Sequence, residues 1–290
     1  MRQLSHTNIV TYKASYLDQA TMTLNIFMEY CPGGTLTEVI EKHKSEGTKI
    51  DAASVWRWLG QLGSALQYCH ARRVLHRDLK TGNIFLDGDG NVKLGDFGIS
   101  RALSTQTSMA ETVVGTPYYM APEVVNSEMY AEPADAWAIG VILYELLALE
   151  RPFDGANIAA LVLKISRGVA SSSAALDGCG HAEELRWLAS ADALLRADAD
   201  ARLSIDQLLR YVDAHASGGG GGAVAAEVRK EQEAKRVSVA NGVGHGLSAV
   251  EEGGSERGGS EVSEVTIEMP ETPAAGGGLA SPGSAWDQYR

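Results

Sequence analysis

Two short motifs in this sequence could transfer a phosphoryl group: His-Arg-Asp-Leu-Lys-Thr-Gly-Asn at 76–83, and the Asp-Phe-Gly that begins at Asp96. Transfer to a hydroxyl needs few protein groups, because catalysis depends on positioning and charge. Asp78 would accept the hydroxyl proton, and Asp96 would hold magnesium against the phosphates. Asn83 would offer a neutral oxygen to that hard cation. Lys80 would neutralise charge on the transferred group. The motifs therefore predict a phosphoryl-transfer site.

The order of these motifs is more specific than any one of them. Asp96 follows 18 positions after Asp78, and Ala-Pro-Glu comes later, at 121–123. A lone Asp-Phe-Gly is usually a turn, and a lone His-Arg-Asp is usually a surface cluster. In this order and at these spacings they form the signature of the protein kinases.

Two metal sites that the sequence could suggest are not favoured. Residues 87–91 resemble the start of a calcium loop, but its sixth position is Val92 rather than glycine and its twelfth is Gly98 rather than glutamate. Cys179 and His181 could bind a metal, yet the sequence has no second pair to complete four ligands. A hairpin turn is the better interpretation of 87–91.

The elements that must position these residues follow from the hydrophobic pattern. It predicts strands at 9–15 and 22–29, a hairpin at 84–86 and 92–94, and helices at 36–43, 54–72, 135–149 and near 157–168, 182–195 and 204–214. The helix at 135–149 is apolar nearly all round, which predicts burial. Residues 97–119 have no period and are rich in Ser and Thr, which indicates a functional loop.

Four side chains of the predicted helix at 54–72 carry expectations of their own. Trp56 and Trp58 are expected to divide between core and surface. Cys69 and His70, at the end of the helix, are interpreted as packing residues.

Composition narrows the class of protein. The 290 residues include 37 acidic and 25 basic side chains, a net charge of −12, which argues against a nucleic-acid partner bound through its phosphates. Cys31, Cys69 and Cys179 are too few for a disulfide framework. The sequence shows no signal peptide, and its most apolar run, 136–149, is too short to cross a membrane. A cytoplasmic protein without a membrane partner is therefore expected.

Glycine divides the chain. Half of the 32 glycines fall in residues 217–290, so we expect a folded body of about 216 residues and a disordered Gly/Ser/Glu-rich tail. Within the tail, 223–240 could form a short charged helix. A dimer through that helix is not favoured, because apolar seam positions are too few. The oligomeric state stays open.

On these motifs the chain resembles the eukaryotic protein kinases across residues 1–214, and within them the NIMA-related (Nek) serine/threonine kinases. The matching stretches are FMEYCPGGTL at 27–36, HRDLKTGNIFLD at 76–87, VKLGDFGIS at 92–100, TVVGTPYYMAPE at 112–123 and ANIAALVLKISRG at 156–168. The resemblance implies an α+β kinase-like fold with a mostly helical C-terminal lobe over 32–216. It also implies transfer of the γ-phosphoryl of ATP, with Mg²⁺, to Ser or Thr of protein substrates.

The same resemblance implies roles around the nucleotide. Met28 would be the gatekeeper, and Glu29 and Cys31 would form the hinge whose backbone pairs with adenine. Phe85 would lie under the adenine ring. Lys80, together with Thr116 before Pro117, would mark serine/threonine specificity.

Further roles concern activation and structure. Thr112 would carry the activating phosphate, with Thr105, Thr107 and Ser108 as rival sites, and Arg77 would receive it. The resemblance also implies structural roles for a larger group of residues: His76, Phe97, Asp135 as an anchor of the catalytic loop, and Glu123 with Arg202 as an ion pair.

Parts of the kinase pattern are not found. A kinase also needs a Gly-rich loop over the phosphates and a strand lysine paired with a helix glutamate. No glycine precedes Gly33, and the only lysine before Lys42 is Lys13, which comes too late for the strand role. Residues 1–31 are therefore expected to be the remnant of an N-terminally truncated N-lobe, and the chain to have little or no kinase activity.

Two functions stay open. The first is a Nek-like kinase, whose family also suggests the cytoskeleton, the centrosome or the cilium as its location. The alternative is a catalytically inactive, kinase-like interaction protein, which the missing nucleotide clamp favours.

Overall fold

The structure, a computed structural model, describes residues 4–95, 117–168, 176, 183–217, 226–231 and 233–234. The described residues belong to one unit that spans Met1–Leu247. Several residues with predicted roles lie outside the described part: Asp96, Phe97, Thr105, Thr107, Ser108, Thr112, Thr116, Cys179 and His181.

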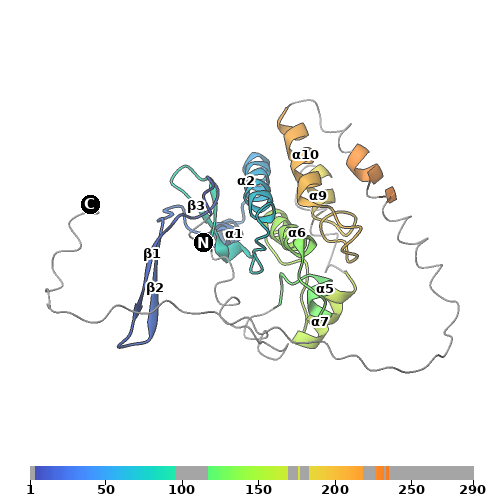
Figure 1. The fold of residues 1–290 in the computed structure, drawn as a ribbon. Helices are drawn as coiled ribbons and strands as arrows, with labels where there is room; N and C mark the ends of the chain where they lie inside the picture. The colour runs from blue at the N-terminus through green and yellow to red at the C-terminus, as the bar shows by residue number, and fades with distance from the viewer. Residues whose placement is uncertain are drawn as a thin grey trace, which may run out of the picture. The chain divides into compact units, whose positions relative to one another are not determined.

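Helix α6 (Glu132–Ala148) is the centre of the packing. Every residue from Ala134 to Leu147 is buried, which confirms the prediction of a helix that is apolar all round. It packs against α2 (Ala52–His70) and α9 (Glu183–Leu188), and α2 packs in turn against α10 (Ile205–Ala216) (Figure 1). A Cβ atom at Gly140 would lie only 2.8 Å from Leu194 Cβ, so this close approach requires glycine.

Helices α1 and α2 begin and end at capping signals. In α1 (Leu36–Glu46), Thr35 and Glu38 form a capping box. The helix runs past the predicted end at 43 because Gly47, at φ 64°, supplies the left-handed cap. In α2, the Asp51 side chain accepts a hydrogen bond from the Ser54 backbone, so the helix begins two residues earlier than predicted.

The expectation for the two tryptophans of α2 was wrong, because both are buried. The Trp56 ring stacks on the Tyr211 ring of α10, with centroids 6.2 Å apart. Trp58 donates its indole N–H to the carbonyl of Gly90 at 2.9 Å. α10 covers one side of this helix and the turn at Gly90 covers another, which leaves neither ring at the surface.

The first sheet is a hairpin of β1 (Tyr12–Asp18) and β2 (Thr23–Met28), paired antiparallel. β1 begins later than the predicted strand at 9–15. Ile9 and Val10 are buried and pair with Leu94 instead of with β2. This pairing ties the hairpin to the second sheet.

The second sheet is the predicted hairpin of β3 (Ile84–Leu86) and β4 (Val92–Leu94). It follows the short helix η1 (Thr81–Asn83). Helices α5 (Pro122–Val125) and α7 (Ile158–Ser166) complete the described elements. With two small sheets and many helices, the fold confirms the α+β class.

Helix α9 is shorter than the helix predicted near 182–195. It ends at Leu188, and the chain then turns, with Leu194 N–H donating to the Leu188 carbonyl at 3.2 Å. The turn buries Leu194 and Leu195 against Gly140 of α6. The apolar residues after Leu188 predict continued helix, but they are buried in a turn instead.

No helix in the described ranges combines the length and apolar character that a bilayer crossing needs.

Candidate active site

The Asp78 carboxylate is held by two neighbours on its own loop. Its Oδ2 accepts hydrogen bonds from Lys80 Nζ at 2.8 Å and from Asn83 Nδ2 at 2.9 Å. The Asp78 side chain is 41% exposed, so a substrate hydroxyl can reach it. Since both contacts use Oδ2, Oδ1 remains to accept a proton. Lys80, Asp78 and Asn83 are therefore brought together as the motif predicted.

Asn83 is orientated in a way that suits a magnesium ligand. Its Nδ2 donates to both the backbone carbonyl of Asp78, at 2.8 Å, and the Asp78 carboxylate. With both amide hydrogens directed to Asp78, the Oδ1 atom points elsewhere. A neutral amide oxygen is a ligand that Mg²⁺ accepts. Asp96, the other expected ligand, lies outside the described residues. Among the described residues, no group of three or more His, Cys, Asp or Glu side chains could hold a metal.

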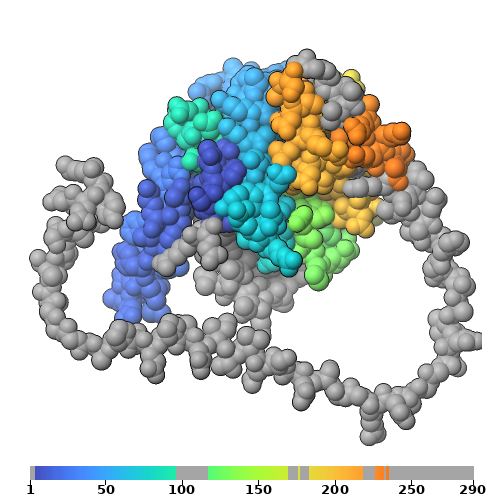
Figure 2. All heavy atoms as spheres, turned by 45° about the horizontal axis from the view of Figure 1, so that its top comes forward, coloured from blue at the N-terminus to red at the C-terminus, as the bar shows by residue number. Residues whose placement is uncertain are grey.

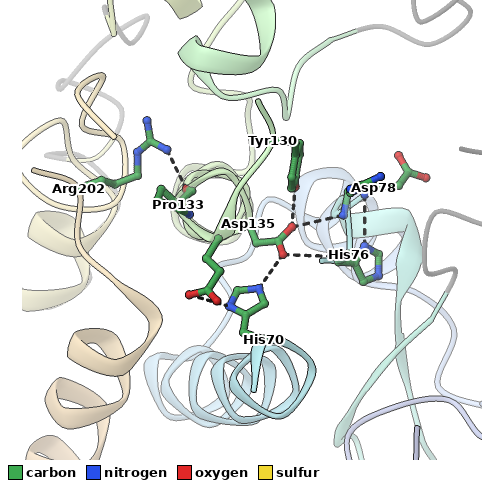
Figure 3. A network of polar contacts seen from close by, with 9 residues as sticks. His70, His76, Asp78, Tyr130, Pro133, Asp135 and Arg202 are labelled. Atoms are coloured by element: carbon green, nitrogen blue, oxygen red, sulfur yellow. Dashed lines mark hydrogen bonds and ion pairs between the residues drawn. The ribbon is translucent and has the colours of Figure 1, made fainter. Parts of the chain in front are cut away.

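The buried Asp135 carboxylate of α6 anchors the catalytic loop (Figure 3). Its Oδ2 accepts the backbone N–H of His76 at 3.2 Å, and its Oδ1 accepts that of Arg77 at 3.4 Å. Arg77 has φ 66°, a left-handed conformation that is strained for an arginine. Asp135 thus offsets the strain of a backbone turn directly before Asp78, and the anchor role expected from the resemblance has a geometric basis.

Two further donors reach the same carboxylate, and sequence reasoning missed both. His70 Nε2 lies 2.8 Å from Asp135 Oδ2, and the Tyr130 hydroxyl lies 2.5 Å from Oδ1. His70 is therefore a polar partner of the anchor, which corrects its interpretation as a packing residue. Burial raises the pKa of Asp135, but the hydrogen bonds from His70, Tyr130 and the His76 backbone outweigh it and lower that pKa overall.

The His76 ring joins the catalytic loop to the segment before Asp96. Its Nε2 lies 2.8 Å from the carbonyl oxygen of Gly95, which can only accept, so Nε2 carries the proton. Nδ1 then accepts the Asp78 backbone N–H at 3.3 Å. His76 is fully buried. The ring thus ties the loop that carries Asp78 to Gly95, the last described residue before the predicted Asp-Phe-Gly motif.

The expected hinge directly follows β2 along the chain and leads into a segment that pairs with β3. Met28 ends β2, and the Gly33 N–H donates to the Leu86 carbonyl at 3.0 Å, while the Leu86 N–H donates to Gly34 at 2.9 Å. A Cβ at Gly33 would lie 2.7 Å from Leu86 Cβ, so this approach also requires glycine. Cys31, in the same segment, is partly exposed.

Phe85 is brought to this hinge by the same pairing. It forms an isolated bridge with Thr35 and packs its ring on Gly95, where a Cβ would come within 2.6 Å of the ring. Phe85 also pairs with Lys93, which contacts Glu29, so Phe85 lies beside the expected hinge, and Met28 directly precedes that hinge at the end of β2.

A further residue of this region, Lys93, was not predicted. Lys93 Nζ lies 2.7 Å from Glu29 Oε1, and the Thr11 backbone donates to Glu29 Oε2 at 3.1 Å. Burial raises the pKa of Glu29, but these partners lower it below its ordinary value overall. The ion pair joins the hinge to β4. A single charged residue between two apolar ones in the short strand β4 is the sequence signal that could have found it.

Beside Lys80 lies an open cavity of about 750 Å³ that also borders Thr81, Tyr119, Glu145 and Arg151. Tyr119 donates its hydroxyl to Glu145 Oε2 at 2.8 Å, and Arg151 Nε lies 3.4 Å from Oε1. Burial raises the pKa of Glu145 above its ordinary value, against hydrogen bonds from Tyr119 and Thr81 that lower it. A buried acid thus forms the wall of a cavity next to the catalytic loop.

This raised pKa predicts a pH dependence of stability. Glu145 has its ordinary pKa of about 4.5 in the unfolded chain and a higher pKa in the folded protein. As pH rises above about 4.5, the unfolded chain therefore loses this proton at a lower pH than the folded protein does, and the free energy of unfolding falls. Glu145→Gln removes that loss. We expect its urea midpoint, relative to wild type, to rise between pH 4 and pH 7. A relative midpoint that stays constant would contradict the assignment.

The expected ion pair of Glu123 and Arg202 is present and buried. Arg202 Nη1 and Nη2 contact the two carboxylate oxygens at 2.7 and 2.8 Å. Arg202 also donates to three backbone carbonyls, those of Arg196, Ala197 and Pro133, the last shown in Figure 3. A guanidinium with this many acceptors is a fixed structural joint between α5 and the segment before α10.

Comparison with known proteins defines the class. Residues 1–212 match the family model of the protein kinase domain, so the chain belongs to the protein kinase family. It is 49% identical to the serine/threonine-protein kinase Nek2 of Homo sapiens over 173 residues, which covers 58% of this chain and 39% of that protein. It is 44% identical to a probable serine/threonine-protein kinase nek2 of Dictyostelium discoideum over 171 residues, covering 58% of this chain and 41% of that protein.

A more distant relative is the G2-specific protein kinase fin1 of Schizosaccharomyces pombe, 36% identical over 187 residues, which cover 58% of this chain and 26% of that protein. These relatives confirm the resemblance to the NIMA-related serine/threonine kinases. The chain spans about two fifths of the length of the Nek2 relatives it matches.

Proposed function

We propose that this chain contains the phosphoryl-transfer site of a NIMA-related kinase and acts on Ser or Thr of protein substrates, with ATP as the phosphoryl donor. The observation that carries the proposal is the Asp78 carboxylate, held by Lys80 and Asn83 on a loop that Asp135 anchors. This arrangement suits phosphoryl transfer to a hydroxyl better than other reactions, because that transfer needs a fixed base beside a cation.

In this reaction the substrate hydroxyl oxygen forms a bond to the γ-phosphorus, and the bond from that phosphorus to the β–γ bridging oxygen breaks. The hydroxyl proton passes to Asp78 Oδ1. Lys80, 2.8 Å from Asp78 Oδ2, neutralises charge on the transferred group and holds the base in place. Asn83 and Asp96 would hold Mg²⁺, which would neutralise charge on the phosphates when bound.

The adenine would lie between the hinge and β3. The pairing of Gly33 and Gly34 with Leu86 brings the backbone of Glu29 and Cys31 to the same region as Phe85. Met28 would limit the depth of that site. For activation, the exposed Arg77 side chain would receive a phosphate on Thr112. By resemblance to Nek kinases, the location would be the cytoplasm, with the cytoskeleton, centrosome or cilium as narrower possibilities.

One observation favours the alternative of an inactive interaction protein. These 290 residues contain no glycine before Gly33, and the only lysine before Lys42 is Lys13, which comes too late in the sequence for the strand role. β1 and β2 form a sheet of two strands, with no third strand beside them in the described part of the chain. We therefore expect the 290-residue polypeptide to transfer phosphate slowly or not at all, while the groups of the catalytic loop remain in place.

Nucleotide binding separates the two functions. At a Mg²⁺–ATP concentration ten times its Kd, binding would stabilise the fold by about 1.4 kcal/mol, which for a domain of this size raises Tm by about 3–5 °C. A thermal-shift titration with and without Mg²⁺ measures this. Asp96→Asn is expected to remove the part that depends on Mg²⁺, whereas Asp78→Asn is expected to keep it. No shift with any nucleotide would favour the interaction protein.

A transfer assay with radiolabelled ATP and a general Ser/Thr protein substrate completes the test. Rapid transfer that Asp96→Asn abolishes would establish the kinase and show that the expectation of low activity is wrong.

A further inference from the structure

Residues 226–231 form a short helical segment that packs against the kinase domain, although the family match ends at 212. Five glycines at 218–222 separate the segment from α10. Figure 2 shows it in dark orange beside the lighter orange residues of α10. The Val228 side chain is completely buried and belongs to the main hydrophobic core, while its neighbours in the segment are exposed. One apolar side chain thus inserts into the domain from beyond the run of five glycines.

The segment also makes specific polar contacts with α10. Glu231 Oε2 accepts hydrogen bonds from Arg210 Nη2 and from Gln207 Nε2, both at 2.8 Å. Gln207 Oε1 in turn accepts the Ser204 backbone N–H at 3.0 Å, a bond of the α10 capping box. The Gln207 amide is therefore fixed at one end by the helix cap and at the other by Glu231. Chance contact of a tail with a surface would not be expected to complete such a bond.

Aromatic side chains form the rest of the contact surface. The Arg229 guanidinium lies over the Trp187 ring of α9, 4.8 Å from its centroid, and Trp187 stacks on Tyr211 of α10 at 5.6 Å. The Tyr211 hydroxyl is buried and has no hydrogen-bond partner in the described residues. Burial raises the pKa of this hydroxyl, and the charge of Arg229 opposes the rise. The surface thus offers an apolar site, a cation site over an aromatic ring and a basic site for an acid.

We propose that α9 and α10 form a docking surface for a short helix with the order aliphatic, cation, any residue, acid, and that residues 226–231 are its reversible occupant within the same chain. The eight residues 218–225 have the sequence GGGGGAVA, and a Gly-rich chain of that length has an r.m.s. end-to-end distance of about 16 Å. A tether of this length holds the segment at a millimolar effective concentration, so a contact with one buried side chain can stay formed in cis although it would be weak between molecules.

Hydrogen exchange of residues 223–234 in the full chain tests the docking. Val228→Asp is expected to speed exchange in this segment at least tenfold, because a carboxylate cannot enter the core. Ala226→Asp, a change at an exposed position of the same segment, is the matched control and should leave exchange unchanged. If both variants exchange at the wild-type rate, the segment is not docked and the proposal is wrong.

A charge exchange keeps the test independent of the folding of the Val228 variant. Glu231→Arg should speed exchange, and the double variant Arg210→Glu/Glu231→Arg should restore it to within about threefold of wild type. A labelled peptide of residues 223–236 should bind full-length Val228→Asp at least tenfold more tightly than wild type, whose own segment competes. Equal binding of the peptide to Val228→Asp and to wild type would show that the segment does not occupy this surface, and would overturn the proposal. A wild-type dimer that Val228→Asp converts to a monomer would overturn docking within one chain.

Discussion

Replacing Asp135 with alanine is expected to lower the free energy of unfolding by about 3–5 kcal/mol, because it removes the shared acceptor of a buried network. His70, Tyr130 and the backbone of His76 and Arg77 all donate to this carboxylate. Water cannot replace the lost oxygens at a site that is 0% exposed. The left-handed turn at Arg77 would lose its support at the same time.

Urea unfolding followed by tryptophan fluorescence measures this change. Asp135→Asn should also destabilise, although less, since the amide group presents hydrogens to donors while one oxygen remains. Asp89→Asn, at an exposed turn position, is the control and should stay within about 0.5 kcal/mol of wild type. An Asp135→Ala variant within 1 kcal/mol of wild type would show that the carboxylate does not anchor the loop.

The lowered pKa of Asp135 sets the sign of its acid dependence. A carboxyl whose folded pKa is depressed stabilises the protein above its unfolded pKa, and that stabilisation is lost as pH falls through the folded value. The gap in stability between wild type and Asp135→Asn should therefore narrow as the pH is lowered below about 4.

Replacing Glu123 with glutamine is expected to cost a similar amount, about 3–5 kcal/mol, because the Arg202 guanidinium would stay buried without its counter-charge. The Arg202 side chain is 0% exposed and that of Glu123 is 9% exposed. The three backbone carbonyls that accept from Arg202 would remain, but carbonyl dipoles do not neutralise a full charge.

A double-mutant cycle distinguishes the ion pair from mere packing. Glu123→Gln combined with Arg202→Met should cost less than the sum of the single variants, with a coupling energy of about 2 kcal/mol or more. Asp192→Asn, which breaks the longer and exposed contact with Arg196 at 3.8 Å, should change stability by less than 0.5 kcal/mol and serves as control. Additive single effects would show that Glu123 and Arg202 act independently.

The catalytic loop could be predicted from sequence because its contacts are local. Lys80 and Asn83 reach Asp78 over two and five positions, and a fixed spacing within one loop is visible in the sequence itself. The same holds for the caps, since Thr35 with Glu38 and Asp51 with Ser54 are neighbours along the chain. Helix α6 was predictable for another reason: a helix that is apolar on all sides is stable in water only when it is buried in a core.

The errors arose where burial depended on distant partners. On an isolated amphipathic helix, Trp56 could have faced solvent. In the structure α10 covers it through Tyr211, which lies 155 positions further along the chain. Ile9 and Val10 have strand-forming side chains, and the sequence does not say that they pair with Leu94 instead of with β2.

By itself the sequence determined the family, and it supplied the proposals for the reaction class and for Asp78 as the base, because those depend on residue types at short, fixed separations. Only the tertiary structure decided what supports them. His70 and Asp135 lie 65 positions apart, and Glu123 and Arg202 lie 79 positions apart. Gln207 contacts Glu231, although a run of five glycines separates them along the sequence. Long-range contacts of this kind depend on how buried surfaces combine over the whole chain, and the spacing of residues along the sequence carries no record of them.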